Sequence, residues 1–184
     1  MATKMKKSLR TNNLGLILRK EYIPNLLTIF RIFLIFPIII LLEKKIFLFT
    51  WILLILGGIT DFLDGYLAKN LNLETRIGSI LDPLADKIFI IIPFLYLCVD
   101  QIIPPWSLSL IIFREFIISV LRQTKSNGMP AINLSKFKSF FQFLSLIFLF
   151  YPLKIDFIIN SGLIFYWSGF ILSLISLLVY LRTK

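Results

Sequence analysis

Residues 61–87 read DFLDGYLAKNLNLETRIGSILDPLADK and form a polar island between two long apolar stretches. The island contains four aspartates in two pairs. Residues three or four positions apart share one face of a helix, so Asp61 would lie beside Asp64 and Asp82 beside Asp86. Two helices joined by a short turn would then bring all four carboxylates to one place.

Four carboxylates close together near lipid require a cation, because an isolated ionised carboxylate is costly at low dielectric and like charges oppose each other's ionisation. The chain has no histidine and one cysteine, so the available ligands are oxygens, which favour Mg²⁺, with Mn²⁺ or Ca²⁺ as alternatives. A pair of such ions assists displacement at phosphorus. We therefore predict a site for two ions at Asp61, Asp64, Asp82 and Asp86.

Small residues are interleaved with these aspartates. Gly65 follows the second aspartate directly, Ala68 lies on the same face, and Gly78 lies one turn before Asp82. Such positions let a bulky ligand approach the backbone. The structural alternative is that Asp-Gly marks a turn and that Asp82 caps a helix with Pro83 in its first turn. Either explanation accounts for one aspartate pair, but neither accounts for both pairs and the small residues.

The composition is that of a membrane protein. The 184 residues are 58% hydrophobic and only 16% charged, with a mean hydropathy of +0.87. A bilayer core of about 30 Å requires about 20 apolar residues per helix. The apolar runs predict six spanning helices near residues 23–42, 46–67, 77–99, 102–122, 137–153 and 157–181. We predict an all-α integral membrane protein, with one six-helix domain over residues 23–184.

The basic residues are distributed around the predicted spans. They do not form a separate basic domain, so the formal charge of +10 does not indicate nucleic-acid binding. They gather before the first span, after the second and fourth, and in the tail, which predicts cytoplasmic termini and a cytoplasmic aspartate site. Residues 1–22 are a basic juxtamembrane segment, in which residues 14–22 predict a short interfacial helix. A secretory signal peptide is disfavoured because the apolar run is too long and no cleavage site follows it.

Charged residues inside the predicted spans are candidates for function. Arg114 and Arg122 lie two turns apart on one side of the fourth helix. With Lys136 or Lys138 from the next helix, they would form a cationic pocket for a phosphate. If the fifth helix already includes Lys136, the two lysines point in different directions and Lys138, which shares a face with Gln142, is the better candidate. The alternative is that both lysines extend to lipid headgroups.

Four other polar residues interrupt the apolar runs. Arg31 lies two turns into the first span, and Glu115 follows Arg114 on a different face of its helix, where it would form a polar tie between helices. Asn25 and Thr28 share a face near the cytoplasmic end of the first span. These two residues would either contact a ligand or cap the helix.

The spacing of the island resembles the signature of the CDP-alcohol phosphotransferases. The matching pattern is Asp61-x-x-Asp64-Gly65-x-x-Ala68-Lys69, eight residues, then Gly78-x-x-x-Asp82-x-x-x-Asp86. The family usually has arginine where this chain has Lys69. Lysine keeps the positive charge but cannot form the planar bidentate hydrogen bonds that arginine makes to phosphate. This difference affects nucleotide affinity more than reaction class.

Three further segments are similar to a bacterial branch of this family that uses glycerol 3-phosphate as the acceptor. They are IPNLLTIFRIFLI (residues 23–35), IIFREFIISVLRQ (residues 111–123) and KFKSFFQ (residues 136–142). The resemblance implies six helices around a polar cavity at the cytoplasmic surface of the bacterial inner membrane, commonly in a homodimer. It also implies transfer of the phosphatidyl group from CDP-diacylglycerol to glycerol 3-phosphate, which gives phosphatidylglycerophosphate and CMP.

The same resemblance implies roles for individual residues. Asp61, Asp64 and Asp82 would ligate Mg²⁺ or Mn²⁺ beside the CDP diphosphate, and Asp86 would be the general base with a metal contact of its own. The nucleotide would be bound by Asn25, Thr28, Gly65, Ala68, Lys69 and Gly78. The acceptor phosphate would be bound by the basic pocket of Arg114, Arg122, Lys136 and Lys138. We predict direct displacement, because the reaction needs mainly positioning and charge neutralisation.

Two kinds of alternative function stay open at this stage. The first keeps the reaction and changes the acceptor to serine, inositol phosphate, or phosphatidylglycerol as in cardiolipin synthesis; the basic pocket disfavours serine. The second is a divalent-cation transporter whose aspartates line the ion pathway. Transporters usually show related halves and helices broken near the midplane, whereas this chain has no detectable repeat and carries its carboxylates near one surface.

Overall fold

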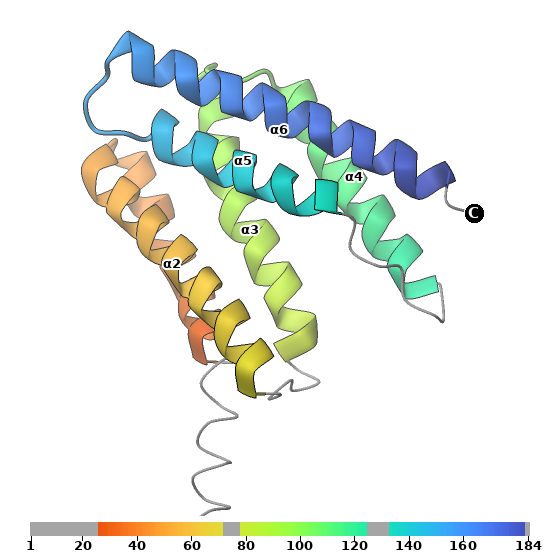
Figure 1. Cartoon of the computed structure of the whole chain (residues 1–184). Helices are drawn as coiled ribbons and strands as arrows, with labels where there is room; N and C mark the ends of the chain where they lie inside the picture. The colour runs from red at the N-terminus through yellow and green to blue at the C-terminus, as the bar shows by residue number, and fades with distance from the viewer. Residues whose placement is uncertain (1–25, 72–77, 125–132, 183–184) are drawn as a thin grey trace, which may run out of the picture. The chain divides into compact units, whose positions relative to one another are not determined.

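The computed structural model describes residues 26–71, 78–124 and 133–182. Its helices are Leu26–Glu43, α2 (Phe47–Leu71), α3 (Gly78–Val99), α4 (Pro105–Thr124), α5 (Asn133–Leu149) and α6 (Asp156–Arg182), as Figure 1 shows. Each corresponds to one of the six apolar runs. The predicted interfacial helix at residues 14–22 lies outside the described residues.

The helix boundaries differ from the predicted ones near prolines. Helix α4 begins at Pro105 and not near residue 102, because proline has no N–H to satisfy and its fixed φ suits the first helical turn. Helix α5 ends at Leu149, three residues before Pro152, which cannot continue a helix. Helix α5 also begins earlier than predicted, at Asn133, and therefore includes Lys136.

The connections after Leu26–Glu43 and after α3 share one backbone conformation, in which a non-glycine residue has a left-handed φ. After the helix Leu26–Glu43, Lys45 has a φ of 56°, and the N–H of Ile46 donates to the carbonyl of Leu41 at 2.9 Å. After α3, Gln101 has a φ of 58° and the next N–H again donates to the carbonyl five residues back, at 2.9 Å. This is the Schellman arrangement, which satisfies carbonyls at a helix end.

The chain forms two compact units. The first unit contains Met1–Phe36 and Leu56–Phe89, and the second contains Pro37–Ile55 and Ile90–Lys184. The aspartate island therefore belongs to the first unit, and the residues of the predicted basic pocket belong to the second.

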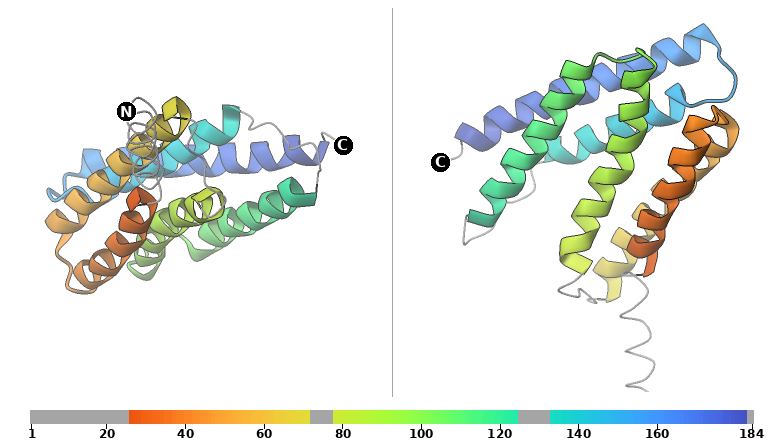
Figure 2. Two further views of the ribbon diagram at one scale, coloured as in Figure 1. Left: turned by 90° about the horizontal axis from the view of Figure 1, so that it is seen from below. Right: turned by 180° about the vertical axis from the view of Figure 1, so that it is seen from behind.

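In the second unit, α5 and α6 lie side by side (Figures 1 and 2). Glycines on α6 allow this approach: a Cβ at Gly162 would lie 2.8 Å from Cγ of Leu149, and a Cβ at Gly169 would lie 3.1 Å from Cγ of Gln142. Small residues commonly bring helix backbones together in membranes, where apolar burial drives association weakly. The same face of α6 therefore presents its small residues to α5.

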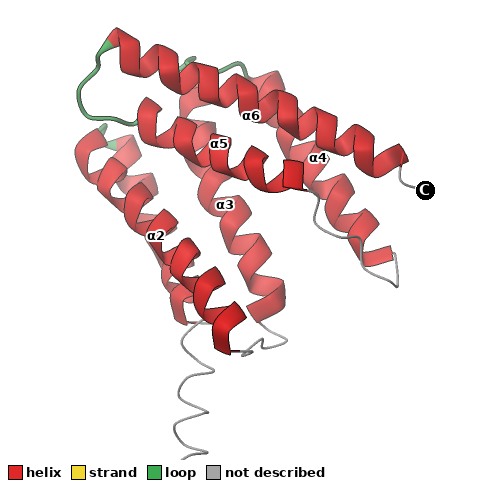
Figure 3. Ribbon diagram, viewed as in Figure 1, coloured by secondary structure: helices red, strands yellow, loops and turns green. Residues whose placement is uncertain are grey.

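The described part of the chain consists of helices and short connections, with no strand (Figure 3), and the all-α prediction is confirmed. Two of its helices, Leu26–Glu43 and Asp156–Arg182, are long and apolar enough to cross a membrane, with mean hydropathies of 2.5 and 2.0. Large apolar side chains such as Phe33 and Phe157 are exposed, as lipid contact requires. These features are typical of a membrane protein; the full set of six spans stays a prediction.

Candidate active site

A buried arginine joins two of the predicted metal ligands in the first unit. Arg31 is 1% exposed, its Nη2 lies 3.2 Å from Oδ1 of Asp61, and its Nη1 donates to Oδ1 of Asp86. The side chains of Asp61 and Asp86 are 58% and 41% exposed. Carboxylates from α2 and α3 thus meet at one guanidinium. The guanidinium is buried, whereas both carboxylates are partly exposed.

Close packing between α2 and α3 explains why these two aspartates meet. A Cβ at Gly57 would lie 2.0 Å from Cζ of Phe89, so a larger residue here would require the Phe89 ring to move. Asp61 follows Gly57 by four residues and Asp86 precedes Phe89 by three, which places each carboxylate one turn from the contact on the same helix face. The glycine therefore sets the distance between the two acidic positions.

The rest of the predicted metal and nucleotide set is only partly described. Thr28 is described and buried, at 1% exposed, whereas Asn25 lies outside the described residues. The backbone of α2 and α3 includes further predicted positions whose side chains lie outside the described set: Asp64, Gly65, Ala68, Lys69, Gly78 and Asp82. Among the described residues, no three acidic, histidine or cysteine side chains form a group that would hold a metal ion. The four-aspartate site accordingly stays a prediction.

The described donors fit a hard divalent ion. Asp61 and Asp86 supply only carboxylate oxygens, the ligands that Mg²⁺ and Mn²⁺ prefer. Both carboxylates approach one positively charged group, which shows that a single cationic centre can contact both. Since these carboxylates are also half-exposed, an ion can approach them from the side away from Arg31.

In the second unit, three charged residues form a buried network on α4 and α5. Nη1 of Arg114 donates to Oε1 of Glu115 at 2.7 Å, and Nζ of Lys138 donates to the same oxygen. Nη2 of Arg114 donates to Oγ of Ser176 on α6 at 2.5 Å. The prediction that Glu115 ties helices together is confirmed, because it joins α4 to α5.

This network brings together two residues of the predicted basic pocket. Arg114 and Lys138 are 1% and 4% exposed, and they converge on one carboxylate. Neighbouring residues on a helix point in different directions, yet the long side chain of Arg114 turns back to Glu115. The backbone of Arg122 lies in α4 and that of Lys136 in α5, but both side chains lie outside the described set. Phosphate binding at these residues stays a prediction.

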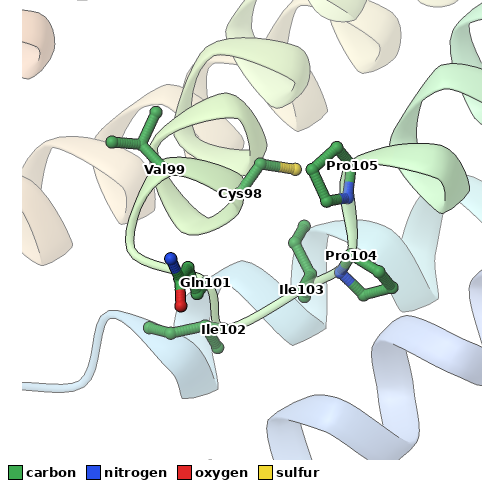
Figure 4. A pocket seen from close by; sticks show the side chains of 7 residues that line it. All are labelled: Cys98, Val99, Gln101, Ile102, Ile103, Pro104 and Pro105. Atoms are coloured by element: carbon green, nitrogen blue, oxygen red, sulfur yellow. The ribbon is translucent and has the colours of Figure 1, made fainter.

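Sequence reasoning missed two partners in these clusters. The position of Arg31 in an apolar run marks it as a functional candidate, but nothing local indicates its two aspartate partners, which lie 30 and 55 residues away. The sequence does not indicate a role for Ser176, because serine is common among the small residues of membrane helices. A surface pocket at the connection between α3 and α4, lined by seven residues of the segment 98–105 (Figure 4), contains no predicted site residue.

Comparison with known sequences decides the family. A sequence model described as CDP-alcohol phosphatidyltransferase matches residues 21–178, which include both charged clusters. The chain belongs to the CDP-alcohol phosphatidyltransferase family. The predicted family is thereby confirmed, and a divalent-cation transporter is disfavoured.

Members of the CDP-alcohol phosphatidyltransferase family from several bacteria are similar to this chain over most of its length. A relative from Blochmanniella floridana is 34% identical over 170 residues, which cover 86% of this chain and 88% of the relative. A relative from Wigglesworthia glossinidia brevipalpis is 35% identical, covering 86% and 92%, and one from Rickettsia felis is 37% identical, covering 67% and 72%. All three are named CDP-diacylglycerol--glycerol-3-phosphate 3-phosphatidyltransferase.

Proposed function

We propose that this chain transfers the phosphatidyl group from CDP-diacylglycerol to sn-glycerol 3-phosphate, giving phosphatidylglycerophosphate and CMP. Family membership and the names of the relatives support this reaction. The observation that carries it is the meeting of Asp61 and Asp86 at one cationic centre, since these aspartates begin and end the family signature.

The catalytic part of the proposal assigns metal ions and a base. Asp61, Asp64, Asp82 and Asp86 would hold Mg²⁺ or Mn²⁺, in two positions. When bound, these ions neutralise the phosphate oxygens and stabilise the attacking and leaving oxygens. Asp86 accepts the proton of the acceptor hydroxyl as the new oxygen–phosphorus bond forms and the bond to CMP breaks. No covalent intermediate is needed, because the acceptor attacks the phosphorus directly.

The binding part of the proposal assigns the two substrates to different residues. Thr28 and Lys69 would contact the nucleotide, together with Asn25, Gly65, Ala68 and Gly78. The acceptor phosphate would be bound by the basic pocket of Arg114, Arg122, Lys136 and Lys138. Arginine and lysine suit this role because charge-assisted hydrogen bonds to phosphate are strong and directional.

The same proposal places the enzyme in the bacterial inner membrane as a homodimer. Its six-helix domain, residues 23–184, would cross the bilayer with both termini in the cytoplasm, since the basic residues flank the predicted spans on that side. The basic segment 1–22 would lie on anionic headgroups. The lipid substrate would then reach the site from the inner leaflet, and the soluble acceptor from the cytoplasm.

Release of CMP by the purified enzyme tests the reaction and the acceptor together. With CDP-diacylglycerol and Mg²⁺ or Mn²⁺ in mixed micelles, we expect CMP release with glycerol 3-phosphate and little with serine, inositol phosphate or phosphatidylglycerol. Chelation should stop the release, and added metal should restore it. Equal turnover with another acceptor would contradict the assignment of the acceptor, and equal turnover after chelation would contradict the assignment of the metal.

A further inference from the structure

Among the described residues of the second unit, four buried polar atoms lack a hydrogen-bond partner; one is the hydroxyl of Tyr96, and the other three belong to α4, α5 and α6. These three are Nε of Arg114, Nε2 of Gln142 and Oγ of Ser173. These residues are 1%, 3% and 0% exposed, so bulk water does not reach them. An unpaired buried polar group costs about 1–3 kcal/mol, and such groups are rare enough in native proteins that each requires an explanation. All three can donate a hydrogen bond.

Two of these residues are placed together by the contact between α5 and α6. Gly169 on α6 packs against the side chain and backbone of Gln142. Ser173 follows Gly169 by one turn on the same face of α6. Gln142 and Ser173 therefore approach from the facing sides of neighbouring helices.

The same helix faces lead directly to the charged network. Ser176 lies one turn after Ser173; it accepts a hydrogen bond from Arg114 and donates to the carbonyl of Ser173 at 2.8 Å. On α5, Lys138 lies one turn before Gln142. The unpaired donors therefore border the network formed by Arg114, Glu115 and Lys138.

The balance of charge and hydrogen bonding in this region favours an anion. Two cations share one carboxylate, that of Glu115, so these three described side chains together carry a net positive charge. The three unpaired groups add donors and no further anion. A tetrahedral phosphate supplies several acceptor oxygens and two negative charges, and therefore matches an excess of donors beside two cations.

We infer that Gln142 and Ser173 are further ligands of the acceptor's phosphate, supplying neutral hydrogen-bond donors beside Arg114 and Lys138. This inference rests on the proposed function, because it adds residues to the same acceptor site. The donors stay unpaired without ligand, and binding of the phosphate satisfies them. The unpaired donors therefore lower the stability of the protein without ligand and raise its affinity for the phosphate, a trade-off that is common at functional sites.

Two substitutions remove these donors with little change in shape, namely Gln142→Met and Ser173→Ala. Each should raise KM for glycerol 3-phosphate by about fivefold to twentyfold, because one hydrogen bond to a charged group is lost. KM for CDP-diacylglycerol should change less than about twofold. Replacing an unpaired donor by an apolar group is neutral or stabilising, so neither variant should unfold at a lower temperature than the wild type without ligand.

Ser145→Ala is the matched control. Ser145 is also buried on α5, but its hydroxyl donates to the carbonyl of Gln142 at 2.8 Å and is therefore paired. This variant should keep both KM values. Thermal unfolding gives a second readout without turnover: glycerol 3-phosphate should stabilise the wild type and Ser145→Ala, and should stabilise Gln142→Met and Ser173→Ala less.

Arg114→Gln separates failure of the inference from failure of the proposed function. If Arg114→Gln raises KM for glycerol 3-phosphate while Gln142→Met and Ser173→Ala leave it unchanged, the acceptor site stands and the inference is overturned. The inference is also overturned if the two variants unfold at lower temperature with unchanged KM, because their donors then serve a structural water. If the wild type neither releases CMP with glycerol 3-phosphate nor is stabilised by it, the proposed acceptor itself fails.

Discussion

The two charged clusters neutralise buried charge in opposite ways. In the first unit a buried arginine supports two aspartates that are half-exposed. In the second unit one carboxylate supports two cations, and all three side chains are at most 15% exposed. The acidic cluster can therefore bind a cation while Arg31 stays in place. An anion that binds the second cluster must enter the buried network of Arg114, Glu115 and Lys138. We expect the first cluster to depend on its ligand for activity and the second to depend on its internal partner for stability.

The largest effect should come from the acidic cluster. Asp61→Asn and Asp86→Asn keep the shape of the side chain and remove its charge, so CMP release should fall at least about 100-fold. Asp100→Asn, at an exposed position in the connection after α3, is the control and should keep its activity. Thermal unfolding checks that the inactive variants are folded. Near-normal turnover of folded Asp61→Asn would remove this cluster from the active site.

Removing the internal partner tests the difference between the clusters directly. Glu115→Gln removes the carboxylate that pairs with both Arg114 and Lys138 and should lower the free energy of unfolding by about 3–5 kcal/mol. Arg31→Met leaves two carboxylates that water still reaches, and should cost about 1 kcal/mol or less. Denaturant unfolding in mild detergent measures both changes. A larger loss for Arg31→Met than for Glu115→Gln would reverse the comparison.

Divalent ions should stabilise the enzyme in the absence of lipid substrate. Since binding to the folded state alone stabilises by RT ln(1 + [L]/Kd), Mn²⁺ at 100 times its Kd should add about 2.7 kcal/mol. Arg31→Met should gain at least as much as the wild type, because the ion then replaces the positive charge that Arg31 supplied to Asp61 and Asp86. The unfolding temperature as a function of Mn²⁺ concentration measures this gain. No gain in either protein would argue against a metal site at these aspartates.

Packing beneath the acidic cluster should have a smaller effect. Gly57→Ala forces a methyl group into the ring of Phe89 and should lower the free energy of unfolding by about 1–3 kcal/mol. It should also reduce turnover, because the aspartates one turn away move apart. The double variant with Phe89→Leu makes room for the methyl group and should recover part of both losses. If the single variant matches the wild type, the contact between α2 and α3 does not set the spacing of the aspartates.

The helices could be predicted from the sequence because lipid imposes a simple rule: about 20 apolar residues must continue without interruption. Two of the boundaries moved near prolines, where local backbone chemistry overrides hydropathy, as at Pro105. The pairing of aspartates within each helix could also be predicted, since it depends only on positions three or four residues apart.

Contacts between distant segments could not be predicted in the same way. Arg31 finds Asp61 and Asp86 because three helices pack together in the first unit, and no local pattern specifies that packing. The sequence predicts that Arg114 and Lys138 converge, because Arg114 lies deep in its span and Lys138 shares a helix face with Gln142. That both would share one carboxylate, and that Ser176 would join them, depends on side-chain rotamers that a single sequence does not reveal.

The order of charges along the chain bears on how the protein enters the membrane. Between Pro105 and Val120, Arg114 and Glu115 are the only charged residues, and they pair with each other. As a predicted span, this helix would enter the bilayer with a neutral pair of its own, at a lower cost than a helix with an unpaired charge. Lys138, on the next helix, adds a second cation to the same carboxylate.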